Sequence, residues 1–347
     1  MIQELDAEGW LARLRETPRP GTENVLVFYE HRMGALCRDP KLMLVPLDDH
    51  LVHRGDGVFE SLRMAEGRIL QLDAHIARLK DSAAALGLEP PCPWDEVRSI
   101  VLDVARAAGV ADGGLKILLG RGGGGLGVDP RECPRSSLFM VATRSRPLPR
   151  DYWDRGLTAC RSAVPAKQPY LAQIKSTNYL PNMLMAREAA ERGVNVSFSF
   201  DERGCLAEAA IANVAVVDAE GRLLLPPFQH SLPGTTALLA MELARAFMPV
   251  ILTDISEDIV YEASEILVLG TTPECVAVTH YEGRPIGNGR PGPVARRLRQ
   301  ELHAALLAAG TPFSEVPTMR EKAYASQKHP GGPDRRPAVR SRPVIRR

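Results

Sequence analysis

Lysine is scarce in this chain of 347 residues: only seven of its 43 basic residues are lysine, and none occurs between residues 175 and 322. The chain has no apolar run near the roughly 20 residues that a membrane-spanning helix needs, and its first residues contain no apolar signal-peptide core. The six cysteines are scattered, with no C-x-x-C pair. These absences argue against a membrane protein, a zinc knuckle and a disulfide scaffold, and they predict a cytoplasmic protein with reduced thiols and no metal site.

The formal net charge of +1 hides an uneven distribution along the chain. Residues 320–347 carry a net charge of +7, whereas residues 1–319 carry −6. An acidic body argues against a folded nucleic-acid-binding domain with a basic face. The basic tail alone is able to contact nucleic acid or an anionic surface, but charge runs at chain ends are usually solvated. We therefore expect small molecules, rather than nucleic acid, to be the main partners.

Strand-like and helix-like patterns are mixed without a strict βαβ rhythm, which predicts an α+β or mixed α/β fold rather than a doubly wound parallel sheet. Strands are expected at 25–30 and 42–46, and a hairpin at 57–72. Asp73 is expected to cap the helix that follows the hairpin. A strand at 115–119 is expected to end in a glycine-rich loop.

Composition also predicts the domain boundaries. The polar, proline-bearing stretch 144–152 is predicted to link a smaller N-terminal domain, 1–143, to a larger C-terminal domain, 153–312. Hydrophobic periodicity is lost after residue 311, so residues 313–347 are predicted to form a disordered basic tail.

The glycine-rich loop at 120–125 formally satisfies the G-x-G-x-x-G spacing after a strand. A dinucleotide-binding loop needs a helix to begin there and an acidic residue about 20 positions later. The sequence continues instead with a turn at Asp129-Pro130, and no carboxylate lies near residue 140. We therefore reject the dinucleotide interpretation; a flexible hairpin loop and a lid over an active site both remain open.

Three other features suggest chemistry. Lys175 lies at a predicted strand–helix junction, and a desolvated lysine can lose its proton and act as a nucleophile, which arginine cannot. Gly234 to Thr236 open a helix, where free N–H groups and two hydroxyls suit a phosphate, although a simple helix cap is equally compatible. Glu208 lies among apolar residues, either as a half-buried carboxylate paired with a cation or as an ordinary edge residue.

Together these features resemble the fold-type IV pyridoxal-phosphate enzymes, the class IV aminotransferases. That family includes D-amino-acid and branched-chain aminotransferases and 4-amino-4-deoxychorismate lyases. The resemblance covers about residues 25–309 and rests on motifs in one order: GDGVFE at 55–60, DAHIARL at 73–79, KSTNYL at 175–180, Glu208 with Asn213, LPGTT at 232–236 and GTTPE at 270–274. It implies a two-domain fold, a homodimer and pyridoxal 5′-phosphate as cofactor.

The resemblance also implies a role for each matching residue. Lys175 would form the internal aldimine and move a proton during the reaction. Glu208 would pair with the pyridine nitrogen of the cofactor, and Tyr179 would approach its O3′. The phosphate and the rest of the cofactor would be held by Arg78, Thr235, Thr236 and Thr271.

The substrate is less well defined by the sequence. The spacing after Lys175 matches the D-amino-acid and lyase branches, whereas Arg63 resembles the branched-chain pattern. Arg121 matches one residue of a carboxylate-binding loop, but Leu126 replaces its second arginine. Thr272 would face the substrate carboxylate. We therefore expect an aminotransferase acting on an amino acid of D- or branched-chain type and a 2-oxo acid, with the lyase reaction as the alternative.

Overall fold

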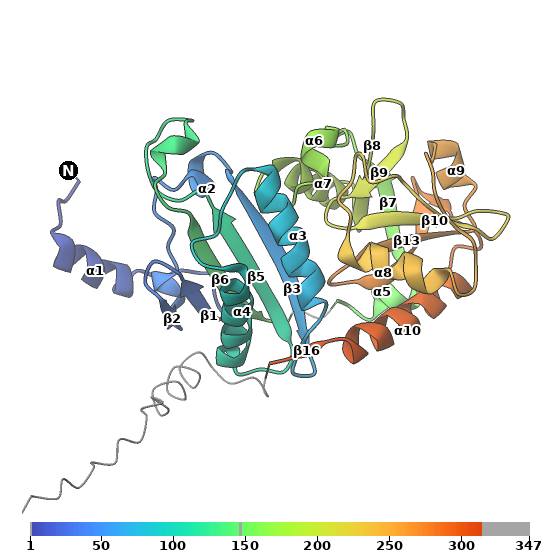
Figure 1. Cartoon of the computed structure of the whole chain (residues 1–347). Helices are drawn as coiled ribbons and strands as arrows, with labels where there is room; N and C mark the ends of the chain where they lie inside the picture. Colours follow the sequence, from blue (N-terminus) through green and yellow to red (C-terminus); the bar gives the residue numbers. More distant parts are fainter. Residues whose placement is uncertain (1, 146–147, 314–347) are drawn as a thin grey trace, which may run out of the picture. The chain divides into compact units, whose positions relative to one another are not determined.

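Two β-sheets organise the chain in the computed structural model, which describes residues 2–145 and 148–313. All structural statements below concern these two ranges. Figure 1 shows the strands of each sheet with helices packed on them. The predicted mixed α/β class is confirmed.

The first sheet has seven antiparallel strands in the order β16-β4-β3-β5-β6-β1-β2. The strands are β1 (Val25–Glu30), β2 (Ala35–Cys37), β3 (Gly57–Ala65), β4 (Arg68–Ile69), β5 (Gly113–Gly120), β6 (Ser137–Arg144) and β16 (Thr311–Pro312). Helices α3 (Leu72–Ala85) and α4 (Trp94–Ala108) pack on one face. Because side chains alternate along a strand, β3 buries Val58 and Leu62 while Phe59 stays half-buried between them.

The second sheet is mixed, with eight strands in the order β12-β11-β10-β13-β14-β7-β8-β9 and a ninth, β15, beside β14. The strands are β7 (Leu157–Arg161), β8 (Val196–Phe200), β9 (Leu206–Ala209), β10 (Asn213–Val217), β11 (Leu223–Leu225), β12 (Val250–Leu252), β13 (Glu265–Gly270), β14 (Glu274–Tyr281) and β15 (Arg284–Pro285). Its central strands β10 and β13 are buried almost along their whole length, because alternate residues of each strand pack into hydrophobic clusters on opposite faces. Helices α8 (Thr235–Ala244) and α10 (Pro293–Ala308) share a hydrophobic cluster with strands of this sheet.

The other helices are short or peripheral. They are α1 (Ala7–Glu16), α2 (His50–His53), α5 (Asp151–Asp154), α6 (Pro169–Ala172), α7 (Leu180–Glu191) and α9 (Glu257–Tyr261), with 3-10 turns at Pro40–Leu42 and Pro130–Glu132. No helix among the described residues is long and apolar enough to cross a membrane. The loop after β5 leads to a 3-10 turn and not to an α-helix, which agrees with rejecting the dinucleotide interpretation.

Two local predictions for the first sheet were wrong. Residues 42–46 form no strand: a 3-10 turn ends at Leu42, and Leu44 and Val45 are exposed without a partner strand. Asp73 does not cap α3, because β4 ends early at Ile69 and the helix begins at Leu72. Asp73 lies inside the first turn and pairs with Arg98 at 2.7 Å.

The predicted domain division remains a prediction. The chain passes from the first sheet to the second through 144–152, of which residues 146 and 147 lie outside the described ranges. After α10 it returns to the first sheet, where Thr311 pairs with Ile69. The predicted tail, 313–347, lies outside the described residues except for Phe313, which is buried and whose N–H bonds to the Gly67 carbonyl at 3.2 Å.

The core under α10 provides a stability prediction. Leu298 is completely buried in the cluster with α8 and the second sheet. Replacing it with alanine should leave a cavity and lower the free energy of unfolding by about 2–5 kcal/mol. Urea unfolding followed by circular dichroism measures the loss. The control is Leu11→Ala on α1, a helix that buries no residue and where we expect a change within about 0.5 kcal/mol; equal losses in both variants would contradict the assignment of the core.

Candidate active site

Lys175 is fixed at a junction between the two sheets. Its N–H donates to Ser82 Oγ of α3 at 3.1 Å, and its carbonyl accepts the Phe59 N–H of β3 at 2.9 Å. The residue precedes α7 as predicted, but the preceding segment is not a strand: only an isolated bridge joins Ser176 to Val58. The first sheet and its helix α3 therefore hold the backbone of Lys175, whereas the residues that follow it lead through α7 into the second sheet.

The Lys175 amine is withdrawn from solvent and lies beside two aromatic rings, those of Phe59 and Tyr179. Its Nζ donates to Tyr179 Oη at 3.2 Å and lies 4.6 Å from the centre of the Phe59 ring. Burial, reinforced by the positive charge of Arg78, lowers the pKa of Lys175 to about 8. A substantial fraction of this amine is therefore neutral, and hence nucleophilic, slightly above neutral pH. Burial raises the pKa of Tyr179, so its hydroxyl stays protonated.

Glu208 on β9 supplies a buried carboxylate to the same cavity. One oxygen lies 3.3 Å from Lys167 Nζ, and the other accepts the Leu232 N–H at 3.2 Å. Burial raises the pKa of Glu208, and the charge of Lys167 opposes that rise. Sequence reasoning missed Lys167; its only signal was that it is one of seven lysines and lies eight residues before Lys175.

The start of α8 forms an anion-binding cradle. Gly234 precedes the helix, and a Cβ there would lie only 2.0 Å from Asn213 Oδ1, so any larger residue would have to displace the Asn213 side chain. No side chain caps the helix, and Thr235 Oγ1 is buried without a hydrogen-bond partner among the described residues. Arg78 Nη1 reaches the Pro233 carbonyl beside it at 3.4 Å. Free N–H groups, an unpaired hydroxyl and a guanidinium at one helix start fit a phosphate group.

Arg78 is positioned by a buried carboxylate that the sequence analysis did not assign. Glu60 accepts two parallel bonds from Arg78, at 2.7 and 2.8 Å, and one from His75 Nδ1 at 2.7 Å. Burial alone would raise the pKa of Glu60, but the hydrogen bonds from Arg78 and His75 outweigh it and lower the pKa to about 2. The carboxylate is therefore ionised throughout the physiological range.

All residues predicted to contact the cofactor line one cavity. They are Arg78, Lys175, Tyr179, Glu208, Thr235, Thr236 and Thr271. They span almost 200 positions of the sequence and come from both sheets, so only the tertiary fold assembles them. The cavity thus combines an amine of lowered pKa, a buried carboxylate and a phosphate cradle, which is the set that pyridoxal phosphate requires.

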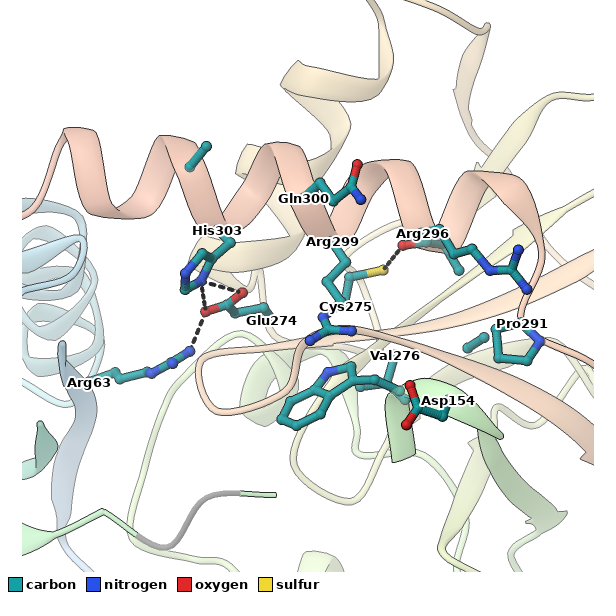
Figure 2. Close-up of a pocket in the computed structure, with 14 residues that line it drawn as sticks. Arg63, Asp154, Glu274, Cys275, Val276, Pro291, Arg296, Arg299, Gln300 and His303 are labelled. Atoms are coloured by element: carbon teal, nitrogen blue, oxygen red, sulfur yellow. Dashed lines mark hydrogen bonds and ion pairs between the residues drawn. The ribbon is translucent and has the colours of Figure 1, made fainter. Parts of the chain in front are cut away.

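The three residues predicted to contact substrate do not line this cavity. Arg63 forms an ion pair with Glu274, to which His303 Nδ1 is also bonded at 3.1 Å (Figure 2). Arg121 binds both oxygens of Asp56, at 2.9 and 3.1 Å. Thr272 is exposed. In the isolated chain each arginine already has a carboxylate partner.

Comparisons with known proteins agree with this geometry. The family model described as Amino-transferase class IV matches residues 57–281. The chain is 30% identical over 289 residues to a chloroplastic D-amino-acid transaminase of Arabidopsis thaliana, covering 80% of this chain and 76% of that protein. It is 29% identical over 262 residues to the branched-chain-amino-acid aminotransferase of Escherichia coli, covering 72% and 84%. The chain belongs to the class IV aminotransferase family.

Solved structures of the family show the same fold. A crystal structure of the branched-chain aminotransferase of Escherichia coli has a TM-score of 0.77 and 26% identity, covering 81% of this chain and 95% of the other. A second branched-chain amino acid aminotransferase was solved with pyridoxamine 5′-phosphate. Its match to this chain has a TM-score of 0.77 and 25% identity, and covers 82% of this chain and 95% of the other. This class IV transaminase accordingly uses pyridoxal 5′-phosphate.

The Glu60 cluster gives a pH prediction. Because the pKa of Glu60 in the fold is below its ordinary value, its ionised form stabilises the protein above about pH 4.5, and that contribution is lost as the pH falls toward 2. The shift corresponds to about 3 kcal/mol at neutral pH. Glu60→Gln should remove this contribution. The variant's loss of unfolding free energy, relative to the unchanged protein, should therefore be roughly 1.5 kcal/mol smaller at about pH 3.5 than at about pH 6.

Unfolding free energies at the two pH values measure this narrowing. The matched control is Asp73→Asn, which breaks an exposed pair with Arg98 and should show a small deficit. A Glu60→Gln deficit that does not change with pH would show that the carboxylate is not ionised in the fold.

Proposed function

We propose that this enzyme transfers an α-amino group between an amino acid of D- or branched-chain type and a 2-oxo acid, and that Lys175 carries the cofactor and moves the proton. The observation that carries the proposal is the Lys175 amine, buried with a pKa lowered to about 8, in the same cavity as Glu208 and the start of α8. The two substrate classes are those in the names of the relatives. The relatives reported above are aminotransferases, and they give the lyase alternative no support.

Positively charged and neutral hydrogen-bond donors would bind the phosphate of the cofactor, and a carboxylate would bind its ring nitrogen. Arg78 and the N–H groups and hydroxyls at Thr235 and Thr236 would bind its phosphate, with Thr271 closing the cavity nearby. Glu208 would bind its pyridine nitrogen, because a cation there offsets the cost of burying the carboxylate. When bound, the cofactor provides an electron-withdrawing ring that accepts the electrons left on the substrate α-carbon after deprotonation.

Lys175 and Tyr179 would handle the proton. Lys175 Nζ can take up a proton because its pKa is near 8, and it can release the proton again without a large free-energy change. The protonated Tyr179 hydroxyl, 3.2 Å away, orients the amine. Both residues are half-buried, which limits the access of bulk water to the exchanged proton.

A homodimer in the cytoplasm is part of this proposal. All six cysteines are free thiols, which suits a reducing compartment. Light scattering of the purified enzyme should give twice the mass of one chain; a monomer would contradict the dimer without affecting the proposed chemistry.

The role of Lys175 can be tested with a substitution that keeps the charge. Lys175→Arg should lower the rate of amino transfer by at least ~10²-fold, because arginine cannot release its proton. It should also remove the visible absorbance of bound pyridoxal phosphate after dialysis. Lys80→Arg on α3, where the ammonium lies 5.8 Å from the Trp94 ring, is the control and should leave both readouts unchanged. Retained activity in Lys175→Arg would refute the proposal.

A half-reaction screen decides the substrate class. The enzyme loaded with cofactor is mixed with a single amino acid, D-alanine or L-leucine, and the cofactor spectrum is followed. Conversion by D-alanine alone assigns the D-amino-acid type, and conversion by L-leucine alone assigns the branched-chain type. No spectral change with either would refute both assignments.

A further inference from the structure

A second cavity, of about 760 Å³, lies between α10, β14 and α5. Its volume is within the roughly 300–1,000 Å³ that is typical of small-molecule sites. None of its lining residues also lines the catalytic cavity. Figure 2 shows α10 on one side of it, with the strand that carries Glu274 and Val276 opposite.

The charges at one end of this cavity are internally compensated. Glu274 is bound by Arg63 and His303, so that the carboxylate and the Arg63 guanidinium satisfy each other. The Glu274 side chain is held in this network by these contacts and is itself buried. This end has little remaining capacity to bind a charged ligand.

The other end carries two arginines without a carboxylate partner. Arg296 and Arg299 lie three residues apart on α10, hence on one face, and neither has an ion-pair partner among the described residues. The Arg299 guanidinium stacks 4.5 Å from the centre of the Trp153 ring, whose indole N–H is buried without an acceptor. Asp154 is the one carboxylate besides Glu274 in the lining, so three arginines face two carboxylates there.

The chemistry of this end favours one ligand class. A guanidinium binds a carboxylate through two parallel hydrogen bonds. Val276, Ala277 and Ala295 add apolar surface to the indole ring, which suits a hydrocarbon or aromatic body better than a bare inorganic ion. We propose that this cavity binds a small organic carboxylate with an apolar or aromatic body, held by Arg296 and Arg299 over Trp153.

Fluorescence of Trp153 provides a direct binding assay. The chain has only three tryptophans, so Trp10→Phe with Trp94→Phe leaves Trp153 as the only indole. The cofactor-loaded enzyme with these two changes is titrated with benzoate, its uncharged analogue benzamide and inorganic phosphate. We expect a saturable change with benzoate and none with benzamide. An equal response to benzamide would overturn the carboxylate requirement, and an equal response to phosphate would overturn the need for an organic body.

Two charge-removing variants on the same helix test the location. Arg299→Gln should weaken benzoate binding at least tenfold, because it removes the guanidinium above Trp153. Arg297→Gln is the matched control: Arg297 pairs with Glu301 and stacks on Phe247, outside the cavity, so its loss should change affinity less than twofold. Equal effects of the two variants would overturn the proposal.

A calorimetric titration guards against misfolding of the tryptophan variants. Benzoate is titrated into the cofactor-loaded enzyme that keeps all three tryptophans, and into its Arg299→Gln and Arg297→Gln forms. Heat of binding that is lost only with Arg299→Gln supports the site. Binding that survives in Arg299→Gln would place benzoate elsewhere and overturn the proposal. Because the readout is binding at a cavity separate from Lys175, its failure leaves the proposed amino transfer untouched.

Discussion

The arrangement of the candidate active site depends on the hydrogen bonds that the buried Glu60 carboxylate accepts from His75 and Arg78. The carboxylate extends from β3 and binds His75 and Arg78 of α3, and Glu60 and His75 are almost completely buried. Removing one partner from such a cluster leaves an uncompensated charge, which is strongly destabilising. The consequence is mainly positional. Because both oxygens of Glu60 are bound, the Arg78 guanidinium has a fixed orientation and reaches the Pro233 carbonyl at the start of α8. A helix packed on the first sheet thus places a cation beside the proposed phosphate site, which lies at a helix packed on the second sheet.

Burial and neighbouring charges together set the pKa values of Lys175 and Glu208 in this cavity. Burial disfavours both the positive form of Lys175 and the negative form of Glu208, so it moves their pKa values toward each other. Arg78 reinforces the effect on the lysine, whereas Glu60 and Glu208 oppose it. Lys167 opposes the effect on Glu208. The free enzyme therefore holds an amine that can deprotonate near neutral pH and a carboxylate that gains from a cationic ligand, and both conditions suit a protonated pyridine ring.

Sequence reasoning succeeded where the information was local or came as an ordered series of motifs. The strand Val25–Glu30 begins and ends at the residues that its apolar pattern predicts. The residues singled out by the motifs line one cavity. It failed where partners distant in sequence decide the outcome. Strand β14, Glu274–Tyr281, is buried almost throughout, so it lacks the alternation that marks a half-exposed strand. Lys167 has no motif of its own, and only the fold brings it to the buried carboxylate. Arg63 and Arg121 matched substrate patterns. Each pairs with a carboxylate of the chain in this structure, and their contact with substrate remains a prediction.

The scarcity of lysine acquires a physical meaning in this cavity. Arginine serves where a fixed two-bond geometry is needed, as in the pair between Arg78 and Glu60. In the proposed reaction lysine serves where a proton must leave, since an arginine at position 175 would remain charged at any physiological pH. The second lysine of the cavity acts on the first, because the charge of Lys167 also lowers the pKa of Lys175. It partners Glu208 at the same time. One cation therefore partners a buried carboxylate and also favours the neutral, nucleophilic form of the neighbouring amine, so Glu208 and Lys175 are electrostatically linked through Lys167 in the free enzyme.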